Sequence, residues 1–300
     1  AYLFAGPRGV GKTTTARLLA KSLNCLRGPT PDPCNDCDPC REIAGGSSLD
    51  VMEMDAASNR GIDEIRDLRE RVRLVPAGGR RAVYIIDEVH QLTGFSFDAL
   101  LKTLEEPPPH AVFILATTEP HEVPATIHSR CQRFMFRLIE PEEVTRRLGD
   151  VATREGLEVE PAALEKIALA GQGSLRDSLM VLDQVAARVA AAGARARILA
   201  AAVEDVLGLL PTETADRMVE RLADGDAGGC LAVLDRLVTE GYDPMQVARD
   251  LRDHIRSLFR FGLGGEAALP DIVRARRTQL AAQAERLGPA RLAAALEALS

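Results

Sequence analysis

The stretch Gly6-Pro7-Arg8-Gly9-Val10-Gly11-Lys12-Thr13 decides the fold of this chain. It follows a short apolar run at 1–5 and precedes a segment of helical period at 13–24. It fits the pattern G-x-x-x-x-G-K-[ST] in the context that the pattern needs, with a strand before it and a helix after it. We therefore expect an α/β domain built around a phosphate-binding loop.

The residue types of this loop predict what it binds. Glycines let backbone N–H groups approach phosphate oxygens, and the following helix directs its N-terminal dipole at the same anion. Lys12 supplies charge to the β- and γ-phosphates, and the hydroxyl of Thr13 ligates Mg²⁺. The predicted nucleotide contacts are Gly6, Arg8, Gly9, Val10, Gly11, Lys12, Thr13 and Thr14. The alternative is a glycine-rich structural turn that matches the pattern by chance.

A second stretch, Val83-Tyr84-Ile85-Ile86-Asp87-Glu88, is an apolar strand that ends in two carboxylates. In phosphate-loop proteins such an aspartate holds Mg²⁺, and we assign Asp87 to that ion. Side chains alternate along a strand, so Glu88 faces elsewhere and is predicted to act as the general base toward the attacking water. The alternative is a pair of solvated acids at a strand end. His90 is interpreted as structural.

The wider pattern predicts a parallel five-stranded sheet followed by helices only. Strand-like runs at 1–5, 49–54, 82–86, 111–116 and 131–136 alternate with helical segments, which is typical of a parallel α/β sheet. After residue 141 the strand signal stops. We predict an α/β domain over 1–140, a small helical lid domain over 141–203 and an all-α collar domain over 204–300.

Four cysteines lie within sixteen residues, as Cys25-x₈-Cys34-x₂-Cys37-x₂-Cys40. This spacing fits a closed tetrahedral Cys₄ zinc site with a structural role, in an insertion over 25–46. Disulfides are the alternative, and a nucleotide-binding chain without a signal peptide makes them less favoured. An iron–sulfur cluster is a further alternative. Cys131 and Cys230 are isolated and are interpreted as packed thiols.

Composition limits the class of protein. The 300 residues are 46% apolar and 27% charged, with a net charge of −7, which is typical of a globular protein and excludes binding of nucleic acid through bulk positive charge. No apolar run approaches the ~18–20 residues of a membrane span. We therefore expect no membrane partner. The chain also lacks an initiator Met and opens in mid-pattern, so we expect an N-terminal truncation.

Several further segments occur in a fixed order with the motifs above. They are Asp87-Glu88-Val89-His90, LLKTLEEPP at 100–108, Ala116-Thr117-Thr118, Ser129-Arg130-Cys131 and GSLRD at 173–177. Together with the phosphate loop and the cysteine insertion they resemble the AAA+ clamp-loader ATPases, and among them the gamma/tau subunits of bacterial DNA polymerase III. The resemblance covers residues 1 to about 190, whereas the helical remainder is only consistent with the collar of that family.

The resemblance implies roles for individual residues. Lys12 and Thr13 match the Walker A pair, and Asp87 and Glu88 match the Walker B pair. Three further residues match polar groups that act on the γ-phosphate: Thr118 as sensor 1 (with Thr117 as the neighbour it could be confused with), Arg130 as the arginine finger toward the adjacent subunit, and Arg176 as sensor 2. Without the ordered motifs, Arg130 and Arg176 would be interpreted as surface ion-pair residues.

The resemblance also implies cofactors, partners and a location. These are ATP, Mg²⁺ and structural Zn²⁺, a ring of other clamp-loader subunits, a sliding clamp and primer–template DNA, in the cytoplasm at the replication fork. Polymerase core and helicase would bind through a C-terminal region that this sequence lacks. An N-terminal segment with part of the adenine pocket is also expected to be missing.

A local basic surplus offers a candidate DNA contact. Residues 60–81 hold seven Arg and four acids, and the stretch Ser58-Asn59-Arg60-Gly61 precedes a helix whose N-terminal amides could meet a phosphate. Helices at corresponding places track duplex DNA in clamp loaders. We expect Arg60 and its neighbours to contact the DNA backbone, with a solvated amphipathic helix as the alternative.

The leading hypothesis is therefore an ATPase in which ATP binding opens the clamp and DNA-triggered hydrolysis releases it. A small-molecule kinase with the same phosphate loop is the second class, and it would need an acceptor pocket. A non-hydrolysing scaffold subunit is the third, and the intact Lys12, Thr13, Asp87 and Glu88 argue against it.

Overall fold

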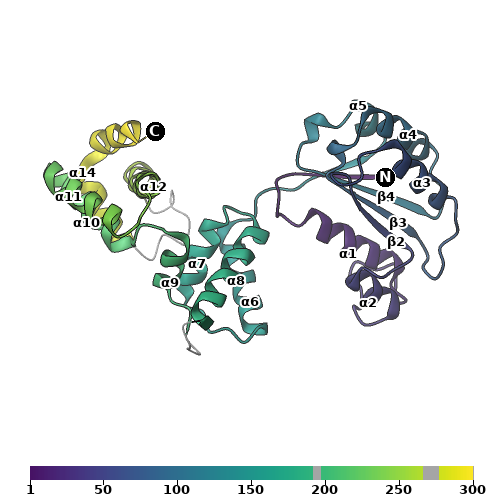
Figure 1. The fold of residues 1–300 in the computed structure, drawn as a ribbon, viewed down its shortest axis with the longest axis horizontal. Coiled ribbons are helices and arrows are strands. Elements are labelled where there is room, and N and C mark those ends of the chain that lie inside the picture. Colours follow the sequence, from purple (N-terminus) through teal and green to yellow (C-terminus); the bar gives the residue numbers. More distant parts are fainter. Residues whose placement is uncertain (192–196, 266–276, 300) are drawn as a thin grey trace. The chain divides into compact units, whose positions relative to one another are not determined.

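The computed structural model of the chain describes residues 1–191, 197–265 and 277–299. It divides into two compact units, Ala1–Leu138 and Ile139–Ser300. Residues 192–196 of the predicted lid, and 266–276 and 300 of the predicted collar, lie outside the described residues. Figure 1 shows the succession of strands and helices in the first unit and of helices alone in the second.

The first unit contains the predicted parallel sheet of five strands, and this prediction is confirmed. The strand order is β2-β3-β4-β1-β5, and every neighbouring pair is parallel. The strands are β1 (Tyr2–Ala5), β2 (Val51–Asp55), β3 (Ala82–Asp87), β4 (Ala111–Thr117) and β5 (Gln132–Met135). The continuous apolar runs of β3 and β4 are buried because these strands lie inside the sheet with helices on both faces.

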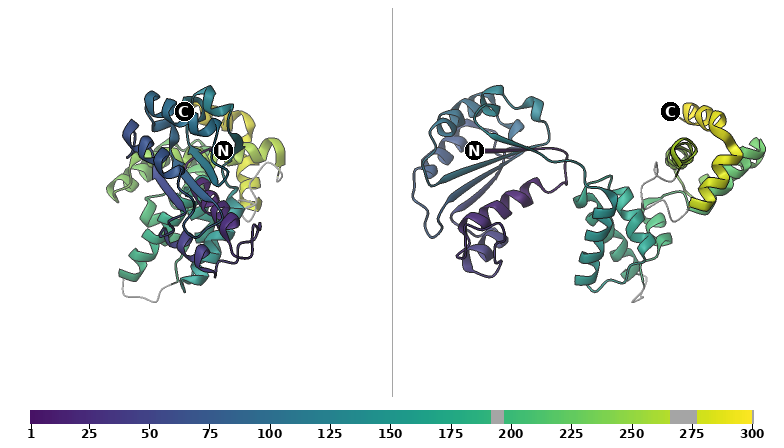
Figure 2. Two further views of the ribbon diagram at one scale, coloured as in Figure 1. Left: turned by 90° about the vertical axis from the view of Figure 1, so that its right-hand side faces the viewer. Right: turned by 180° about the vertical axis from the view of Figure 1, so that it is seen from behind.

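Helices cover both faces of this sheet, as the views in Figures 1 and 2 agree. One face, with Phe4 and Ile85, packs against Ala16 and Ala20 of α1. The opposite face packs against α3 and α4, which contribute residues such as Leu68 and Leu100 to a larger core. The helical elements are α1 (Lys12–Asn24), α2 (Asp38–Gly45), α3 (Ile62–Val72), η1 (Val89–Gln91), α4 (Gly94–Glu105), η2 (Pro120–Glu122) and α5 (Ala125–His128).

The topology brings three loops to one edge of the sheet. Because all strands are parallel, the carboxyl ends of β1, β3 and β4 meet at the same edge, where open α/β sheets bind their ligands. The loops that leave these ends are the phosphate loop, the turn after Asp87 and the turn after Thr117. The fold thus gathers segments that lie up to about a hundred residues apart in the sequence.

In its described residues the second unit is helical, apart from one isolated β-bridge between Val159 and Ile198. Pro141 and Pro161 begin α6 and α7, where proline fits the first turn, and Ser174 Oγ accepts the N–H of Asp177 at the start of α8. The helices are α6 (Pro141–Arg154), α7 (Pro161–Ala170), α8 (Leu175–Ala191), α9 (Ala200–Leu207), α10 (Thr212–Asp224), α11 (Ala227–Thr239), α12 (Pro244–Gly264) and α14 (Arg277–Ala298).

Two separate hydrophobic clusters stabilise this unit. One is formed by α6 to α9, with Leu148, Ile167 and Val185 fully buried. The other is formed by α10, α11, α12 and α14, around residues such as Val219 and Leu258. Among the described residues, none of the helices is both long and apolar enough to traverse a bilayer.

Candidate functional site

Glycine shapes the phosphate loop, which connects β1 to α1. Gly6 approaches β5 so closely that a Cβ atom there would lie 2.2 Å from the carbonyl oxygen of Phe136. Gly11 caps α1 with φ at 94°, a left-handed conformation that side chains disfavour. Within α1 the N-terminus has no side-chain cap and no acidic residue in its first turn. An anion is the partner that such an N-terminus favours.

Lys12 lies inside the loop. Its Nζ donates to the carbonyl oxygens of Gly6 and Pro7, both at 2.8 Å, and the residue is only 6% exposed. Burial lowers the pKa of Lys12, and the carboxylates of Glu88 and Asp87 oppose that shift because they favour the charged amine. An ammonium held by two neutral carbonyls gains a stronger hydrogen bond when an anionic phosphate replaces them.

The two predicted magnesium ligands contact each other. Thr13 Oγ1 donates to Asp87 Oδ2 at 2.6 Å, although the residues lie 74 positions apart. The other oxygen, Asp87 Oδ1, accepts the backbone N–H of Glu88 at 2.9 Å. A hydroxyl and a carboxylate are the hard oxygen ligands that Mg²⁺ takes together with water and phosphate. This pair fits that ion.

Glu88 diverges from Asp87 because its backbone is left-handed, with φ 47° and ψ 48°. Alternation along a strand also predicts that the two side chains diverge, but β3 ends at Asp87 and the turn itself redirects the side chain of Glu88. A left-handed backbone is uncommon for residues other than glycine, and such conformations gather at functional sites.

Thr118 holds the carboxylate of Glu88. Glu88 Oε2 accepts the N–H of Thr118 at 3.1 Å and its Oγ1–H at 2.8 Å. The neighbouring Thr117 is fully buried, and its Oγ1 accepts the N–H of Glu119 at 3.0 Å. Of the two threonines, Thr118 is therefore the one in contact with the predicted base. The structure thus brings Lys12, Thr13, Asp87, Glu88 and Thr118 together at one sheet edge.

The remaining predicted residues of the phosphate loop differ in exposure. Arg8 and Thr14 are exposed, whereas Val10 is buried. Gly9 has φ at 75°, so it shares the left-handed conformation of Gly11. Arg8 therefore presents its guanidinium to solvent beside the loop, where a bound phosphate could recruit it.

The two arginines predicted to act on the γ-phosphate, Arg130 and Arg176, are not among these residues. Arg130 follows α5, where its guanidinium contacts the carboxylate of Glu105 and donates to the carbonyl of Thr126 at 2.7 Å. None of the contacts described for Arg130 involves the phosphate loop. Arg176 is exposed in the first turn of α8, in the other unit.

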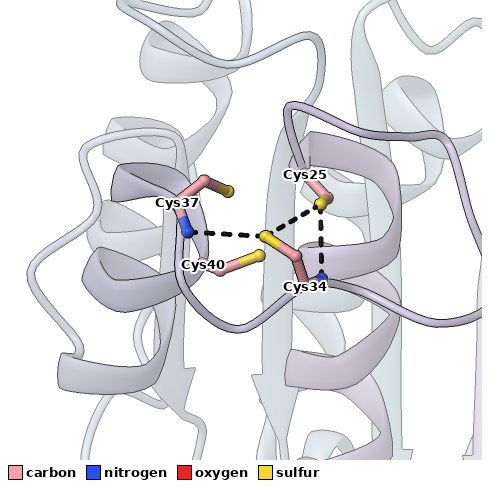
Figure 3. A group of neighbouring side chains, drawn as sticks. All are labelled: Cys25, Cys34, Cys37 and Cys40. Atoms are coloured by element: carbon pink, nitrogen blue, oxygen red, sulfur yellow. Dashed lines mark hydrogen bonds between the residues drawn. The ribbon is translucent and has the colours of Figure 1, made fainter.

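The four clustered cysteines converge as their spacing predicts. Their Sγ atoms all lie within 4.8 Å of one another, and those of Cys25 and Cys34 are 3.6 Å apart. A tetrahedral site with Zn–S bonds of about 2.3 Å needs sulfurs about 3.8 Å apart, so the donor set fits zinc. Figure 3 shows Cys25 at the end of α1 and Cys40 on the neighbouring helix, with their sulfurs pointing into one space. That helix, α2, was not predicted from the sequence.

Backbone N–H groups prepare part of the cluster for a metal. The N–H groups of Asp36 and Cys37 lower the pKa of Cys34 to about 6, and the N–H of Leu26 lowers the pKa of Cys37. Burial has the opposite effect on Cys40 and raises its pKa to about 12. No described cysteine forms a disulfide. The cluster therefore combines thiols that ionise readily with one that ionises only when a cation stabilises its thiolate.

The basic stretch 60–81 differs in one respect from the sequence interpretation. Its helix, α3, begins at Ile62 with Asp63 and Glu64 in the first turn, and the carboxylate of Glu64 lies over Gly61. Acidic groups therefore already occupy the N-terminus of α3, and its amides are poor phosphate contacts. Arg60 is exposed, and its Nε donates to the carbonyl of Ala57 at 2.9 Å. The exposed guanidinium groups of this stretch are the better candidates.

One residue with a buried side chain at this site could not be recognised from the sequence. His90 was given no role, yet its ring lies between Glu88 and Thr117. No sequence signal marks it, because its contacts depend on how β3 and β4 pair in the sheet.

Comparison with known proteins finds three family models in succession along the chain. The model described as "DNA polymerase III, delta subunit" matches residues 1–140, and "DNA polymerase III clamp loader subunit, ATPase lid domain" matches 143–190. The model described as "DNA polymerase III subunits gamma and tau domain III" matches 198–299.

Curated proteins from several bacteria are similar over most of the chain. The DNA polymerase III subunit tau of Bacillus subtilis is 45% identical over 264 residues, which are 87% of this chain and 46% of that protein. The subunit gamma/tau of Mycobacterium tuberculosis is 40% identical over 297 residues, 97% of this chain and 51% of that protein. The subunit tau of Escherichia coli is 44% identical over 243 residues, which are 81% of this chain and 37% of that protein. The chain thus spans about half the length of these relatives, or less.

Among solved structures, the RuvB Holliday junction branch migration motor of Thermotoga maritima shares the fold. The TM-score is 0.51 at 19% sequence identity, over 83% of this chain and 78% of that one. At this identity the likeness concerns the arrangement of strands and helices alone.

Proposed function

The chain belongs to the family of DNA polymerase III gamma and tau subunits, and on that premise we propose that it is an ATP-hydrolysing clamp-loader subunit. ATP binding would drive opening of a sliding clamp, and hydrolysis on primed DNA would release the closed clamp. The observation that carries this proposal is the meeting of Lys12, the Thr13–Asp87 pair and the Glu88–Thr118 pair at one sheet edge.

Each group of this site has a task in the proposed reaction. Lys12 exchanges the carbonyls of Gly6 and Pro7 for the β- and γ-phosphates. Thr13 and Asp87 would hold Mg²⁺, which would supply the positive charge that offsets the phosphates.

Glu88 is the base of the proposed reaction, and it takes a proton from the attacking water. Its Oε2 accepts both bonds from Thr118 in this structure, and Oε1 is the oxygen proposed to contact the water. The γ-phosphate is the proposed partner that draws the Thr118 hydroxyl away.

The two arginines are proposed to complete the site from outside. Arg130 would leave Glu105 and reach the ATP of an adjacent subunit. Arg176 would act on the γ-phosphate held by its own subunit. Cations at these positions stabilise the charge that develops during phosphoryl transfer. In this proposal the isolated chain binds ATP but turns it over slowly.

The rest of the chain fits the same proposal. Residues 1–140, 141–203 and 204–300 would be the ATPase, lid and collar domains, with the two helical clusters of the second unit as the cores of the latter two. Zn²⁺ in the cysteine cluster would hold the insertion at 25–46. Partner subunits, the clamp and primed DNA would bind at the replication fork in the cytoplasm, with Arg60 and its neighbours near the DNA backbone.

The decisive experiment is the ATPase rate of the chain alone and with partner subunits, clamp and primed DNA. We expect a low basal rate that rises when all components are present, and a DNA-dependent part that weakens with salt. Transfer of phosphate to an added small-molecule acceptor would instead support a kinase. Absence of nucleotide binding would support a scaffold role.

A variant tests the proposed action between subunits. Arg130→Ala should leave ATP binding unchanged and abolish the stimulated rate only in the assembled complex, because its target is the neighbour's nucleotide. Arg146→Ala, which removes a solvent-exposed ion pair in α6, is the matched control. A loss of basal turnover in the isolated Arg130→Ala chain would contradict the proposal.

A further inference from the structure

A buried histidine lies beside the candidate base. His90 belongs to the short helix η1, directly after Glu88, and its side chain is only 6% exposed. Its Nδ1 lies 3.1 Å from Thr117 Oγ1 and 3.4 Å from Glu88 Oε2. Its Nε2 lies 2.9 Å from the amide nitrogen of Gln91. One ring therefore contacts the turn after β3 and the end of β4 at the same time.

The partners of the ring fix where its proton lies. The amide nitrogen of Gln91 can only donate, so Nε2 of His90 is the acceptor. In a neutral imidazole the single N–H is then at Nδ1. This N–H points toward Thr117 Oγ1, with the carboxylate of Glu88 just beyond hydrogen-bond length. Gln91 thus orients His90 as a donor on the side of the base.

We propose that His90 is a positioning residue that holds the carboxylate of Glu88 in place during ATP hydrolysis. This inference rests on the proposed function and deepens it. Glu88 has a left-handed backbone, which persists only where neighbouring contacts hold it. Thr118 supplies two of these contacts in this structure.

The role of His90 begins when Thr118 turns to the nucleotide. A threonine hydroxyl has one proton, so Thr118 Oγ1 cannot donate to Glu88 and to a γ-phosphate together. Among the described residues, His90 is then the side-chain donor that remains within reach of Glu88 Oε2. A small shift shortens 3.4 Å to a hydrogen bond. His90 keeps the carboxylate of Glu88 in position while Thr118 contacts the γ-phosphate.

The test compares two side chains that imitate different ring nitrogens. In the assembled complex with primed DNA, His90→Asn places an amide N–H near the Nδ1 position, and His90→Gln places it near Nε2. We expect His90→Ala and His90→Gln to lower kcat about tenfold, as loss of an orienting partner commonly does. His90→Asn should recover most of that loss. The KM for ATP should change less than about threefold in all three variants, because His90 is not among the residues proposed to contact the nucleotide.

A matched control addresses stability. His110 is another partly buried histidine of the same unit, and its Nε2 bonds the carbonyl of Val72, far from Glu88 in sequence. His110→Ala should destabilise the unit without changing kcat. If His90→Ala does not fold, the comparison of His90→Asn with His90→Gln decides the question alone.

Three results would overturn the inference. In the first, the Asn and Gln variants lose the same activity, and in the second kcat falls together with a raised KM and a lowered Tm, as packing alone would produce. In the third, kcat is unchanged in every variant. If the unmodified complex shows no ATP hydrolysis, the proposed function falls as well. If it hydrolyses ATP and only the His90 pattern fails, the proposed function stands.

Discussion

The two candidate ligand sites of the first unit are assembled in opposite ways. The cysteine cluster uses four residues between positions 25 and 40, so a short segment closes on itself. The phosphate site uses residues from Lys12 to Thr118, which meet only because the sheet aligns the ends of β1, β3 and β4. Local spacing therefore determines the first site, whereas tertiary topology determines the second.

The same helix connects the two sites. Lys12 begins α1 at the phosphate loop, and Asn24 ends it next to Cys25. Thirteen residues of helix span about 20 Å, so the sites lie at opposite ends of one rigid element. The comparison raises a question that variants can answer, namely whether the sites act independently.

The largest expected effect concerns the phosphate site. Glu88→Gln preserves the shape of the side chain and its contact with Thr118 but removes the basic carboxylate. We expect turnover to fall by about 10²- to 10⁴-fold, which is the usual contribution of a general base, while nucleotide affinity stays within about threefold. Single-turnover ATP hydrolysis and nucleotide binding measure the two quantities. Full turnover in Glu88→Gln would refute the assignment of the base.

The second largest expected effect concerns the cysteine cluster. Cys34→Ser removes one of four thiolates, and zinc affinity should fall by more than about a hundredfold, because loss of an outer-shell partner alone costs 10- to 100-fold. A chromophoric chelator measures the affinity, and limited proteolysis of residues 25–46 reports the loss of order. Cys230→Ser, an isolated cysteine on α11, is the control and should leave zinc affinity unchanged. An equal effect of both variants would exclude the cluster as the metal site.

The two sites also differ in how far they could be predicted from the sequence. The cysteine spacing and the glycine-rich loop specify their chemistry within a few residues, and the apolar runs of β3 and β4 are recognisable because both faces of these strands are buried. Pro141 and Pro161 mark helix starts for an equally local reason, since proline fits the first turn.

The contacts that depend on strand pairing could not be predicted. The left-handed turn at Glu88, its bonds to Thr118 and the ring of His90 beside it require β3 and β4 to be neighbours in a known register. The helix α2 was missed because it is only eight residues long and carries a cluster cysteine. Helices of the second unit have amphipathic patterns but no motif, so the sequence predicts their existence and not their partners.

The third prediction concerns pH, which should change the zinc affinity of the cysteine cluster and the ATP affinity of the phosphate site in opposite directions. Zinc binds thiolates, so Cys40, whose pKa is raised to about 12, must release its proton on binding at neutral pH, whereas Cys34, with a pKa of about 6, has already done so. Apparent zinc affinity should therefore rise by at least about tenfold per pH unit between pH 6.5 and 8.5. A competition assay with a calibrated chelator measures it, and an affinity independent of pH would contradict the assignment.

The phosphate site should respond in the other sense at alkaline pH. The pKa of Lys12 is lowered by burial, so its charge is lost at a pH below its usual value of 10.5 as pH rises. A neutral amine attracts phosphate weakly, and ATP affinity should then decrease. Lys12→Arg, which stays charged, should show a flat alkaline profile whatever its absolute affinity. Parallel profiles for both side chains would show that Lys12 does not govern nucleotide binding.

The smallest expected effect tests the connecting helix itself. Asn24 is 3% exposed, and its Oδ1 accepts the N–H groups of Arg80 and Arg81, both at 2.9 Å, just before β3. Asn24→Ala leaves these donors without their partner and should lower the free energy of unfolding by about 2 kcal/mol, roughly a thirtyfold shift in equilibrium. Chemical denaturation measures this change. Asn24→Asp retains the acceptor oxygen but replaces the Nδ2 that donates to the carbonyl of Arg81 at 3.0 Å with a second oxygen, so it should destabilise the unit as well.

The activity of the Asn24→Ala variant then decides whether the two sites are independent. The contacts of Asn24 lie at the opposite end of α1 from Lys12, and a helix that stays folded keeps the phosphate loop in place. We expect ATP turnover within about twofold and zinc affinity within about threefold of the unmodified chain, since distant sites without shared partners contribute additively. A loss of turnover larger than the loss of stability can explain would mean that α1 transmits strain between its ends. The cysteine cluster and the phosphate site would then be coupled through α1.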